Sequence, residues 1–344
     1  MHLLLSTICS VIQMSSVLIT GAPGWLGNTL LESMDKSTRS LRLIVDPIYA
    51  NSDLKALLPA AMADQIEIAS CDLRDSSNVA KNLKDVQTVF HLAAVQHPKR
   101  VSEIYAINSD ATGTLARLAA SAGVEKFVFV SSGIVQGVNT TSEPTNELTQ
   151  TGKIFTHYGF SKLKAEALVQ DVREKTGLHV VIVRPGVFYG RRASANMRRF
   201  LKMIQTKRLP LFGKDGFRRS YVDVQKVAEA LLLAEEKGRS GNAYVISDNQ
   251  ALDTRELYET LAEALGCRPR LVNVPVTVAR MAEKAAFYSG CWLDRHLSTA
   301  NIIGEFGRPN FYVSVRDNEI GFKPLASPRP GLNEMAAAFL RSGG

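Results

Sequence analysis

The stretch that decides the fold is Val17–Gly27, which reads VLITGAPGWLG. Its first four residues, Val17–Thr20, are apolar or β-branched, as in a strand that is buried on both faces of a parallel sheet. Gly21, Gly24 and Gly27 follow at intervals of three. The first glycine permits a tight turn, the second lets backbone N–H groups approach a pyrophosphate, and the third lets a helix lie close to the sheet. The stretch therefore predicts a strand, a phosphate-binding turn and a helix N-terminus that faces the phosphates.

A second apolar run, Leu41–Val45, ends in Asp46, nineteen positions after the third glycine. A carboxylate at this place accepts hydrogen bonds from the two hydroxyls of an adenosine ribose. Because Asp46 would repel a 2′-phosphate, the sequence favours NAD over NADP, although Arg42 or Lys55 could still reach such a phosphate. The alternative is that Asp46 is a solvated residue that begins an Asp-Pro turn with Pro47.

Strand-like and helix-like segments alternate through the first half of the chain. Further strands are expected at Gln65–Ser70, Val86–His91, Lys126–Val130 and Val180–Val183, and long helices at Ser102–Ala122 and Phe155–Lys175. Regular alternation requires crossover connections and a parallel sheet, so we predict an α/β fold with a Rossmann-type doubly wound sheet.

The composition shifts after Gly190, where basic pairs, short helices and turns with glycine follow one another irregularly. We therefore predict an NAD-binding domain at 17–190 and a smaller, mainly substrate-binding α/β lobe at 191–344 that returns to the main sheet in places. Residues 1–16 are expected to be an extension, either disordered or an over-long start. Their apolar run, Leu3–Ile12, resembles the core of a signal peptide, but it lacks a basic residue before it and is too short to span a bilayer.

The composition limits the partners and the compartment. The chain has 344 residues, 22% of them charged, with a formal net charge of +8. Its lysines and arginines are widely spread apart from a few pairs, which suits an anionic small molecule better than nucleic acid. Cys9, Cys71, Cys267 and Cys291 have neither metal-like spacing nor a disulfide pattern. We expect a cytoplasmic protein with no metal site and no membrane span.

Two further segments are candidates for cofactor contacts. Asp72 and Leu73 follow a predicted strand, where a carboxylate and an apolar side chain can hold an adenine by its amine and its face. The alternative is that Asp72 or Asp75 caps a helix. The small residues of Leu92-Ala93-Ala94, after the next strand, would let the cofactor lie flat over the strand ends.

Tyr158 and Lys162 are four positions apart on a predicted helix, so both side chains point to one face. The phenol of a free tyrosine has a pKa of about 10, and a neighbouring ammonium favours its phenolate. The pair is therefore predicted to relay a proton. Ser132, at the end of the predicted strand Lys126–Val130, is placed to hydrogen-bond the same substrate oxygen.

These motifs together resemble the extended short-chain dehydrogenases/reductases, over roughly 17–340. The matching segments, in order, are Thr20–Gly27, Asp72-Leu73, His91–Ala94, Asn108, Ser131-Ser132, Tyr158–Lys162 and Arg184–Gly190. The resemblance implies hydride transfer between a nicotinamide and a carbon that bears a hydroxyl or ketone, with Ser132, Tyr158 and Lys162 catalytic and Asn108 as structural and relay partner. It implies that Lys162 also holds the nicotinamide ribose. Further cofactor contacts are implied for Trp25, Leu26, Pro185, Gly186 and Val187.

Two departures from the family pattern narrow this expectation. Dehydratases of the family carry an Asp-Glu pair directly after the catalytic hydroxyl residue, whereas this chain has Gly133-Ile134, which argues against a dehydratase. Gln136 stands where many members have a tyrosine. The family pattern therefore does not predict the substrate-side wall of the site, although it still predicts the proton relay.

Two substrate classes fit the second lobe. Arg219, before Tyr221-Val222, resembles the diphosphate-binding arginine of nucleotide-sugar enzymes, with Arg192 as an assistant, or both are surface residues. Phe311–Ser314 and Ile320–Pro324 instead resemble the C-terminal pattern of 3β-hydroxysteroid dehydrogenases and related ketone reductases.

The second lobe also contains a group of apolar residues that is expected to line a pocket or to fill the core of the lobe: Met281, Ala285, Ala286, Phe287 and Tyr288. The preferred function is that of an NAD(P)-dependent dehydrogenase or reductase of a secondary alcohol or ketone. The alternatives are a nucleotide-sugar epimerase with tightly bound NAD and, more remotely, a non-catalytic cofactor sensor. The family also implies a homodimer through the helices at 102–122 and 155–175.

Overall fold

A parallel sheet of seven strands forms the centre of the computed structural model, which describes residues 15–35, 37–60, 66–139, 141–149 and 153–343. The strand order is β10-β6-β5-β4-β1-β2-β3. The bounds are β1 Ser15–Thr20, β2 Arg39–Val45, β3 Ile66–Ser70, β4 Thr88–His91, β5 Lys126–Val130, β6 His179–Pro185 and β10 Ala243–Ile246. The prediction of a Rossmann-type doubly wound sheet is confirmed, and β1 begins two residues earlier than expected.

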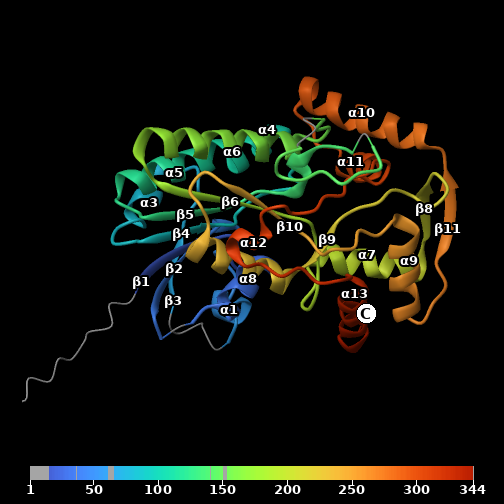
Figure 1. Cartoon of the computed structure of the whole chain (residues 1–344), viewed down its shortest axis with the longest axis horizontal. Coiled ribbons are helices and arrows are strands. Elements are labelled where there is room, and N and C mark those ends of the chain that lie inside the picture. The colour runs from blue at the N-terminus through green and yellow to red at the C-terminus, as the bar shows by residue number, and fades with distance from the viewer. Residues whose placement is uncertain (1–14, 36, 61–65, 140, 150–152, 344) are drawn as a thin grey trace, which may run out of the picture.

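Helices cover both faces of this sheet (Figure 1). On one face α1 (Trp25–Ser33) and α8 (Val224–Lys237) pack on strand residues such as Ile19 and Val183. On the other face α3 (Ser76–Lys81), α5 (Thr112–Ser121) and α6 (His157–Thr176) pack on the alternate residues of the same strands. Burial on both faces explains the continuous apolar runs within the central strands, such as Val17–Ile19 in β1 and Phe127–Val130 in β5.

The helix expected at 102–122 is divided into three segments. A five-residue α4 (Val101–Tyr105) runs into a π-helical segment, η2 (Ala106–Ala111), and only then into α5. π-helical turns of this kind often occur at functional sites, because the extra residue redirects a side chain. Here the segment contains the buried Asn108.

The second half of the chain contributes small sheets and helices beside the main sheet. Two parallel pairs form there, β7 (Val187–Tyr189) with β9 (Tyr221–Asp223) and β8 (Arg208–Phe212) with β11 (Arg270–Val274). The helices of this part are α7 Ala195–Thr206, α9 Thr254–Ala264, α10 Val276–Leu293, α11 Ser298–Phe306, α12 Asp317–Ile320 and α13 Arg329–Arg341. The short elements of the first half are η1 Pro47–Tyr49, α2 Leu54–Leu57 and η3 Gly133–Gln136.

The chain after residue 190 returns to the main sheet through α8 and β10. A separate apolar core joins α7, α9 and α13 to β7 and β9. The division of the chain at residue 190 stays a prediction, and residues 1–14 of the expected extension lie outside the described residues.

The apolar residues of the expected pocket or lobe core divide between two sides of α10. Ala286 is buried and Phe287 packs on His157, but Met281, Ala285 and Tyr288 face outward and are exposed. The expectation that all five line a pocket or fill a core is therefore wrong for the outer three. No helix in the described part of the chain has the length and apolar character needed to cross a bilayer.

The described cysteines, Cys71, Cys267 and Cys291, are free, and the described ranges contain no cluster of side chains suited to a metal. Cys9 lies outside the described residues.

A buried carboxylate two residues after β10 makes the stability of the fold sensitive to pH. Asp248 is 1% exposed and accepts a 2.5 Å hydrogen bond from the Tyr189 hydroxyl, while its Oδ1 atom has no partner among the described residues. Burial, with a smaller contribution from Asp223, raises the pKa of Asp248 to about 7. Because folding raises this pKa, the folded chain holds the proton more tightly than the unfolded chain does. The resulting stabilisation is complete below about pH 4, the ordinary pKa of an aspartate, and is lost as the pH rises through about 7.

We predict that Asp248→Asn removes this pH dependence. Between pH 5 and 8 the free energy of unfolding of the wild type should fall by about 2 to 3 kcal/mol through this group, and the variant should not show that fall. Urea unfolding at both pH values measures the difference, with the exposed Asp171→Asn as control. Equal pH dependence in wild type and Asp248→Asn would contradict the prediction.

Candidate active site

The turn after β1 is built for close approach of backbone. Gly21 has a φ of +93°, and a Cβ at this residue would lie 2.7 Å from the backbone nitrogen of Ala93. Gly24 is the N-cap of α1, and a Cβ on the buried Gly27 would lie 2.7 Å from the Gly21 carbonyl oxygen. The three glycines thus let β1, the loop after β4 and the first turn of α1 meet without side chains between them. This cradle fits a pyrophosphate at the N-terminus of α1.

The residues expected at the adenosine end lie at the ends of β2 and β3. Asp46 is exposed directly after β2, and its carboxylate accepts a 2.9 Å hydrogen bond from the Ile48 backbone. The Asp-Pro turn is therefore formed, and the carboxylate remains open to solvent. Asp72 pairs with the Arg74 guanidinium, whereas Asp75 caps α3 through the Asn78 backbone nitrogen. Of the two alternatives for a helix cap, the structure selects Asp75.

The loop after β4 is held from below by a buried histidine. His91 lies between two hydroxyls, with Nδ1 2.7 Å from Thr20 Oγ1 and Nε2 2.7 Å from Thr112 Oγ1. Burial and the neighbouring Lys162 lower the pKa of His91 to about 3, so the imidazole is neutral. Thr20 Oγ1 also accepts from the Ala93 backbone nitrogen at 3.2 Å. These contacts fix the segment Leu92-Ala93-Ala94 beside the glycine turn.

Ser132 and Tyr158 meet at the carboxyl end of the sheet. Ser132 directly precedes η3, two residues after β5, and Tyr158 lies in the first turn of α6, which Thr156 caps through the Gly159 nitrogen. The Tyr158 phenol hydrogen-bonds to the side chains of Ser132 and Gln96. Burial, the largest cause, raises the pKa of Tyr158 despite these hydrogen bonds. The phenol is therefore protonated at neutral pH.

Lys162 is on the same face of α6 but does not make the contact that the sequence suggested. Its buried Nζ donates a 2.6 Å hydrogen bond to the Val130 carbonyl and lies 4.3 Å from the centre of the Phe129 ring. Burial lowers the pKa of Lys162 to about 7, and Glu166 opposes this shift. The expectation that a nearby ammonium favours the Tyr158 phenolate is wrong for this structure, because the pKa of the phenol is raised and its causes do not include Lys162.

Asn108 links the loop after β4 to α6. Its Oδ1 accepts from the Val95 nitrogen at 2.8 Å, and its Nδ2 donates to the Val95 carbonyl at 2.8 Å and to Ser161 Oγ at 3.1 Å. These hydrogen bonds fix the backbone of Val95, so that Gln96, the residue after Val95, lies beside Tyr158. Asn108 therefore positions the site, in line with the structural role that the family resemblance implies.

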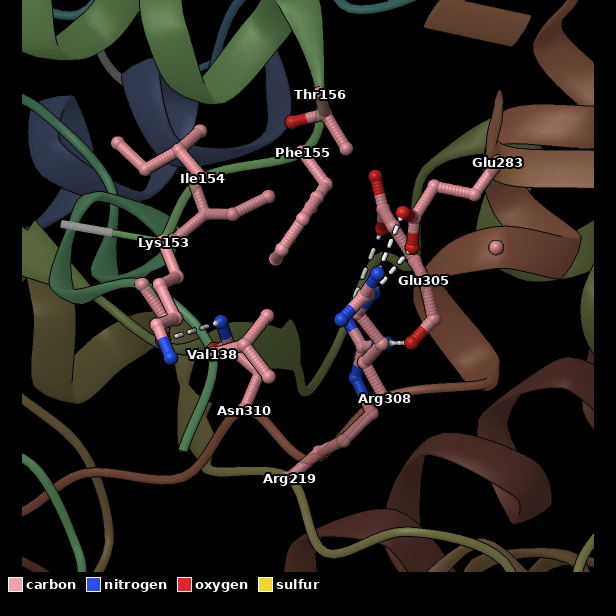
Figure 2. A pocket seen from close by; sticks show the side chains of 13 residues that line it. Val138, Lys153, Ile154, Phe155, Thr156, Arg219, Glu283, Glu305, Arg308 and Asn310 are labelled. Atoms are coloured by element: carbon pink, nitrogen blue, oxygen red, sulfur yellow. Dashed lines mark hydrogen bonds and ion pairs between the residues drawn. The ribbon is translucent and has the colours of Figure 1, made fainter. Parts of the chain in front are cut away.

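A pocket lies between η3, the segment before α6 and the α10–α11 pair. Ser132 and Tyr158 do not line it themselves, but Ile134 and Thr156, each two residues from one of them, do. It is small, about 30 Å³, which is room for one or two water molecules. Figure 2 shows that Arg219, Arg308, Glu283 and Glu305 gather on one side of it.

The guanidiniums in this pocket are paired with carboxylates. Arg219 donates to the Glu305 carbonyl at 2.9 Å and lies 3.6 Å from its carboxylate, and Arg308 donates to Glu283 and stacks on Phe155. Arg192, the other predicted substrate residue, is exposed and pairs with Glu32, and it is not among the lining residues. The structure thus brings Arg219 to the site and does not bring Arg192.

Three residues near Ser132 and Tyr158 were not assigned to the site from the sequence: Gln96, Glu305 and Tyr312. Tyr312 packs so closely on Gly133 that a Cβ there would overlap its ring. Gln96 and Glu305 occur in no recognisable motif. Tyr312 lies within Phe311–Ser314, the segment that resembles the C-terminal pattern of 3β-hydroxysteroid dehydrogenases, but that resemblance did not point to a place in the site.

Gln136, which stands where many family members have a tyrosine, is not among the residues that line the pocket. It is fully buried, accepts a 2.6 Å hydrogen bond from Arg184 Nη1 and donates to the Asn146 carbonyl. Its place in this buried network explains why the substrate-side wall is formed by other residues.

Comparison with known proteins agrees with this geometry. The NAD dependent epimerase/dehydratase family matches residues 17–247, so the chain belongs to that family and is an enzyme of the extended short-chain dehydrogenase/reductase type. It is 25% identical to a UDP-glucose 4-epimerase of Vibrio cholerae over 336 residues, 95% of this chain and 96% of the relative.

Two other likenesses differ in what they act on. The chain is 26% identical over 269 residues to a 4-hydroxy-2-methyl-3-oxo-4-farnesyl-3,4-dihydroquinoline-1-oxide ketoreductase of Stigmatella aurantiaca, covering 77% of each chain. The UDP-glucose 4-epimerase of Thermotoga maritima, solved with UDP-glucose, has the same fold, with a TM-score of 0.74 and 21% identity over 96% of this chain and 100% of that one. The family confirms the expected use of NAD.

Proposed function

We propose that the protein transfers a hydride between NAD and a secondary alcohol or ketone carbon, with Ser132, Tyr158 and Lys162 as the relay. The observation that carries the proposal is the hydrogen-bonded pair of Ser132 and Tyr158 hydroxyls at the carboxyl end of the sheet, where ligands of such folds bind. NAD, when bound, accepts or supplies the hydride at its nicotinamide ring.

The residues of the chain supply the proton chemistry. Tyr158, protonated at neutral pH, is suited to donate a proton to a carbonyl oxygen while Ser132 hydrogen-bonds the same oxygen. In the reverse direction the phenolate takes the proton of the alcohol as the hydride leaves the carbon. We propose that Lys162 holds the nicotinamide ribose. Further cofactor contacts are proposed for Pro185, at the end of β6, and for Gly186 and Val187, which come directly after it. Trp25 and Leu26, the first residues of α1, are proposed to contact the phosphates of the cofactor. Asp46, Asp72 and Leu73 are proposed to contact its adenosine.

A nucleotide-sugar epimerase is the second candidate, and two observations favour it. Arg219 and Arg308 both point into the pocket, where a diphosphate would offer each guanidinium a bidentate partner in place of Glu305 and Glu283. The relatives include UDP-glucose 4-epimerases. A non-catalytic sensor is disfavoured, because the Tyr158–Lys162 pair and the Ser132 contact are all in place.

Ligand-induced melting separates the two candidates. A ligand at a hundred times its Kd stabilises the folded chain by about 2.7 kcal/mol, which gives a measurable rise in Tm. We predict a rise with a hydroxysteroid in the presence of oxidised NAD, or with a long-chain ketone in the presence of reduced NAD. The absorbance of reduced nicotinamide should increase in the first case and decrease in the second. A rise with UDP-glucose or dTDP-glucose alone, and tightly bound NAD after purification, would favour the epimerase instead.

Two further proposals concern the state of the protein. The helices α4, α5 and α6 form one layer on the sheet, and we propose that they make the contact of a homodimer. The free cysteines support a reducing, cytoplasmic setting.

A further inference from the structure

Helix α10 (Val276–Leu293) is turned inside out with respect to an ordinary surface helix. Its protein-facing side consists of Ala279, Glu283, Ala286 and Gly290, which are buried at intervals of four, three and four residues. A surface helix normally buries its large apolar residues and exposes its polar ones. Here the buried face is made of small residues and one glutamate.

The outward side of α10 carries large apolar residues at the same helical spacing. These are Val278, Met281, Ala285, Tyr288 and Trp292, and Leu293 adjoins them. Met281 is 71% exposed and Trp292 is 78% exposed, and the rings of Tyr288 and Trp292 stack with centroids 5.1 Å apart. We call these six residues the outer stripe. Figure 1 places α10 on the outside of the molecule, above the start of α6 and beside α11.

The charges around the outer stripe are mainly basic. Asp294, which follows Leu293, is partly exposed and is paired with the exposed Arg100. Within α10, all of which the structure describes, the one acidic residue is Glu283, which is buried and paired with Arg308. Lys284 is exposed beside the stripe, and Arg295 is exposed just after the helix. An apolar stripe with tryptophan and tyrosine, flanked by lysine and arginine, is the pattern of a helix that lies in the interface of a membrane with anionic lipids.

A second copy of the chain fits this surface less well. A two-fold axis through the middle of the outer stripe would pass near Ala285, so Lys284 would approach its own copy. Like charges at that point oppose self-association, whereas anionic headgroups would neutralise them.

We propose that the outer stripe of α10 docks on the surface of an anionic lipid membrane. The inner side of the same helix contributes Glu283 to the pocket, and Phe287 stacks on His157, the residue before Tyr158, with centroids 4.8 Å apart. Docking would therefore put the lipid surface against the outer side of the helix whose inner side lines the pocket. The proposal concerns the surface and holds whichever reaction the site performs.

Co-sedimentation of the full chain with vesicles tests the proposal. Wild type should bind vesicles of phosphatidylcholine mixed with phosphatidylglycerol, bind pure phosphatidylcholine more weakly, and lose affinity as salt is raised. Trp292→Glu and Met281→Glu should each reduce binding about tenfold or more. Because both side chains are exposed, the variants should fold, which circular dichroism checks. Leu340→Glu, on the exposed part of α13, is the matched control and should bind as wild type does.

Two results would overturn the proposal. One is wild-type chain that stays in solution with anionic vesicles, or variants that bind as tightly as wild type. The other is a dimer by light scattering that Trp292→Glu converts to monomer while vesicles capture nothing, since a second copy would then cover the outer stripe.

Discussion

Tyr158→Phe is expected to lower kcat about a thousandfold on any substrate that the wild-type chain oxidises or reduces. The variant keeps the ring and its packing but removes the hydroxyl that hydrogen-bonds to Ser132 and Gln96. General acid–base catalysis by a positioned side chain contributes about a hundredfold to ten-thousandfold, and Tyr158 is the group proposed to carry the proton. KM should change little, because the lost interaction belongs to the transition state.

The measurement is the rate of change of nicotinamide absorbance, with Tyr288→Phe as control. Tyr288 is also a tyrosine near the pocket helix, but its phenol is on the outward side of α10, so this variant should keep full turnover. Full turnover by Tyr158→Phe would show that Tyr158 does not carry the proton, and the proposed relay would be wrong. Unchanged NAD binding in Tyr158→Phe, followed by melting, separates a chemical defect from a folding defect.

The main sheet and its glycine turn could be predicted because their causes are local in sequence. The run Val17–Thr20 must be buried on both faces, and the three glycines must stand where the backbone of Ala93 and the Gly21 carbonyl oxygen approach. Asn108 was assigned from the family pattern alone. Its actual role needs the π-helical turn, which no periodicity in the helix indicates.

The pocket side could not be predicted in the same way. Glu305 and Tyr312 reach the site from about 150 positions beyond Tyr158, through the packing of the second lobe. Nothing in the sequence separates Arg192 from Arg219 as a substrate residue. In the structure Arg219 lines the pocket, whereas Arg192 is exposed on the surface. Only the tertiary structure separates them.

The electrostatics of the catalytic pair also depends on burial. Four-residue spacing indicated correctly that Tyr158 and Lys162 share a face of α6. It said nothing of the Val130 carbonyl that takes the Lys162 hydrogen bond, nor of the desolvation that lowers the pKa of this lysine to about 7. The spacing of two residues on a helix determines the direction of their side chains. The pKa of each side chain depends instead on its burial and neighbours, which other parts of the fold supply.

Glu166→Gln is expected to destabilise the fold by about 3 kcal/mol or more, because it leaves the Arg184 charge buried without its partner. The two side chains are 9% and 7% exposed, and the guanidinium donates to both carboxylate oxygens at 2.9 and 2.6 Å. Arg184 is in β6 just before Pro185, and Glu166 lies one helical turn after Lys162. Urea unfolding measures the loss, and Glu67→Gln in the exposed pair with Arg42 should cost less than about 1 kcal/mol.

The same variant tests whether this buried pair supports catalysis as well as folding. Glu166 opposes the desolvation of Lys162, so its neutralisation should lower the pKa of the lysine below about 7 and shift the corresponding limb of the pH–rate profile to lower pH. The double variant Glu166→Leu with Arg184→Met removes both charges and should regain much of the stability. It should nevertheless keep the shifted pH profile, because the carboxylate that raises the pKa of Lys162 is still absent. An unshifted profile in both variants would show that Glu166 serves the fold alone.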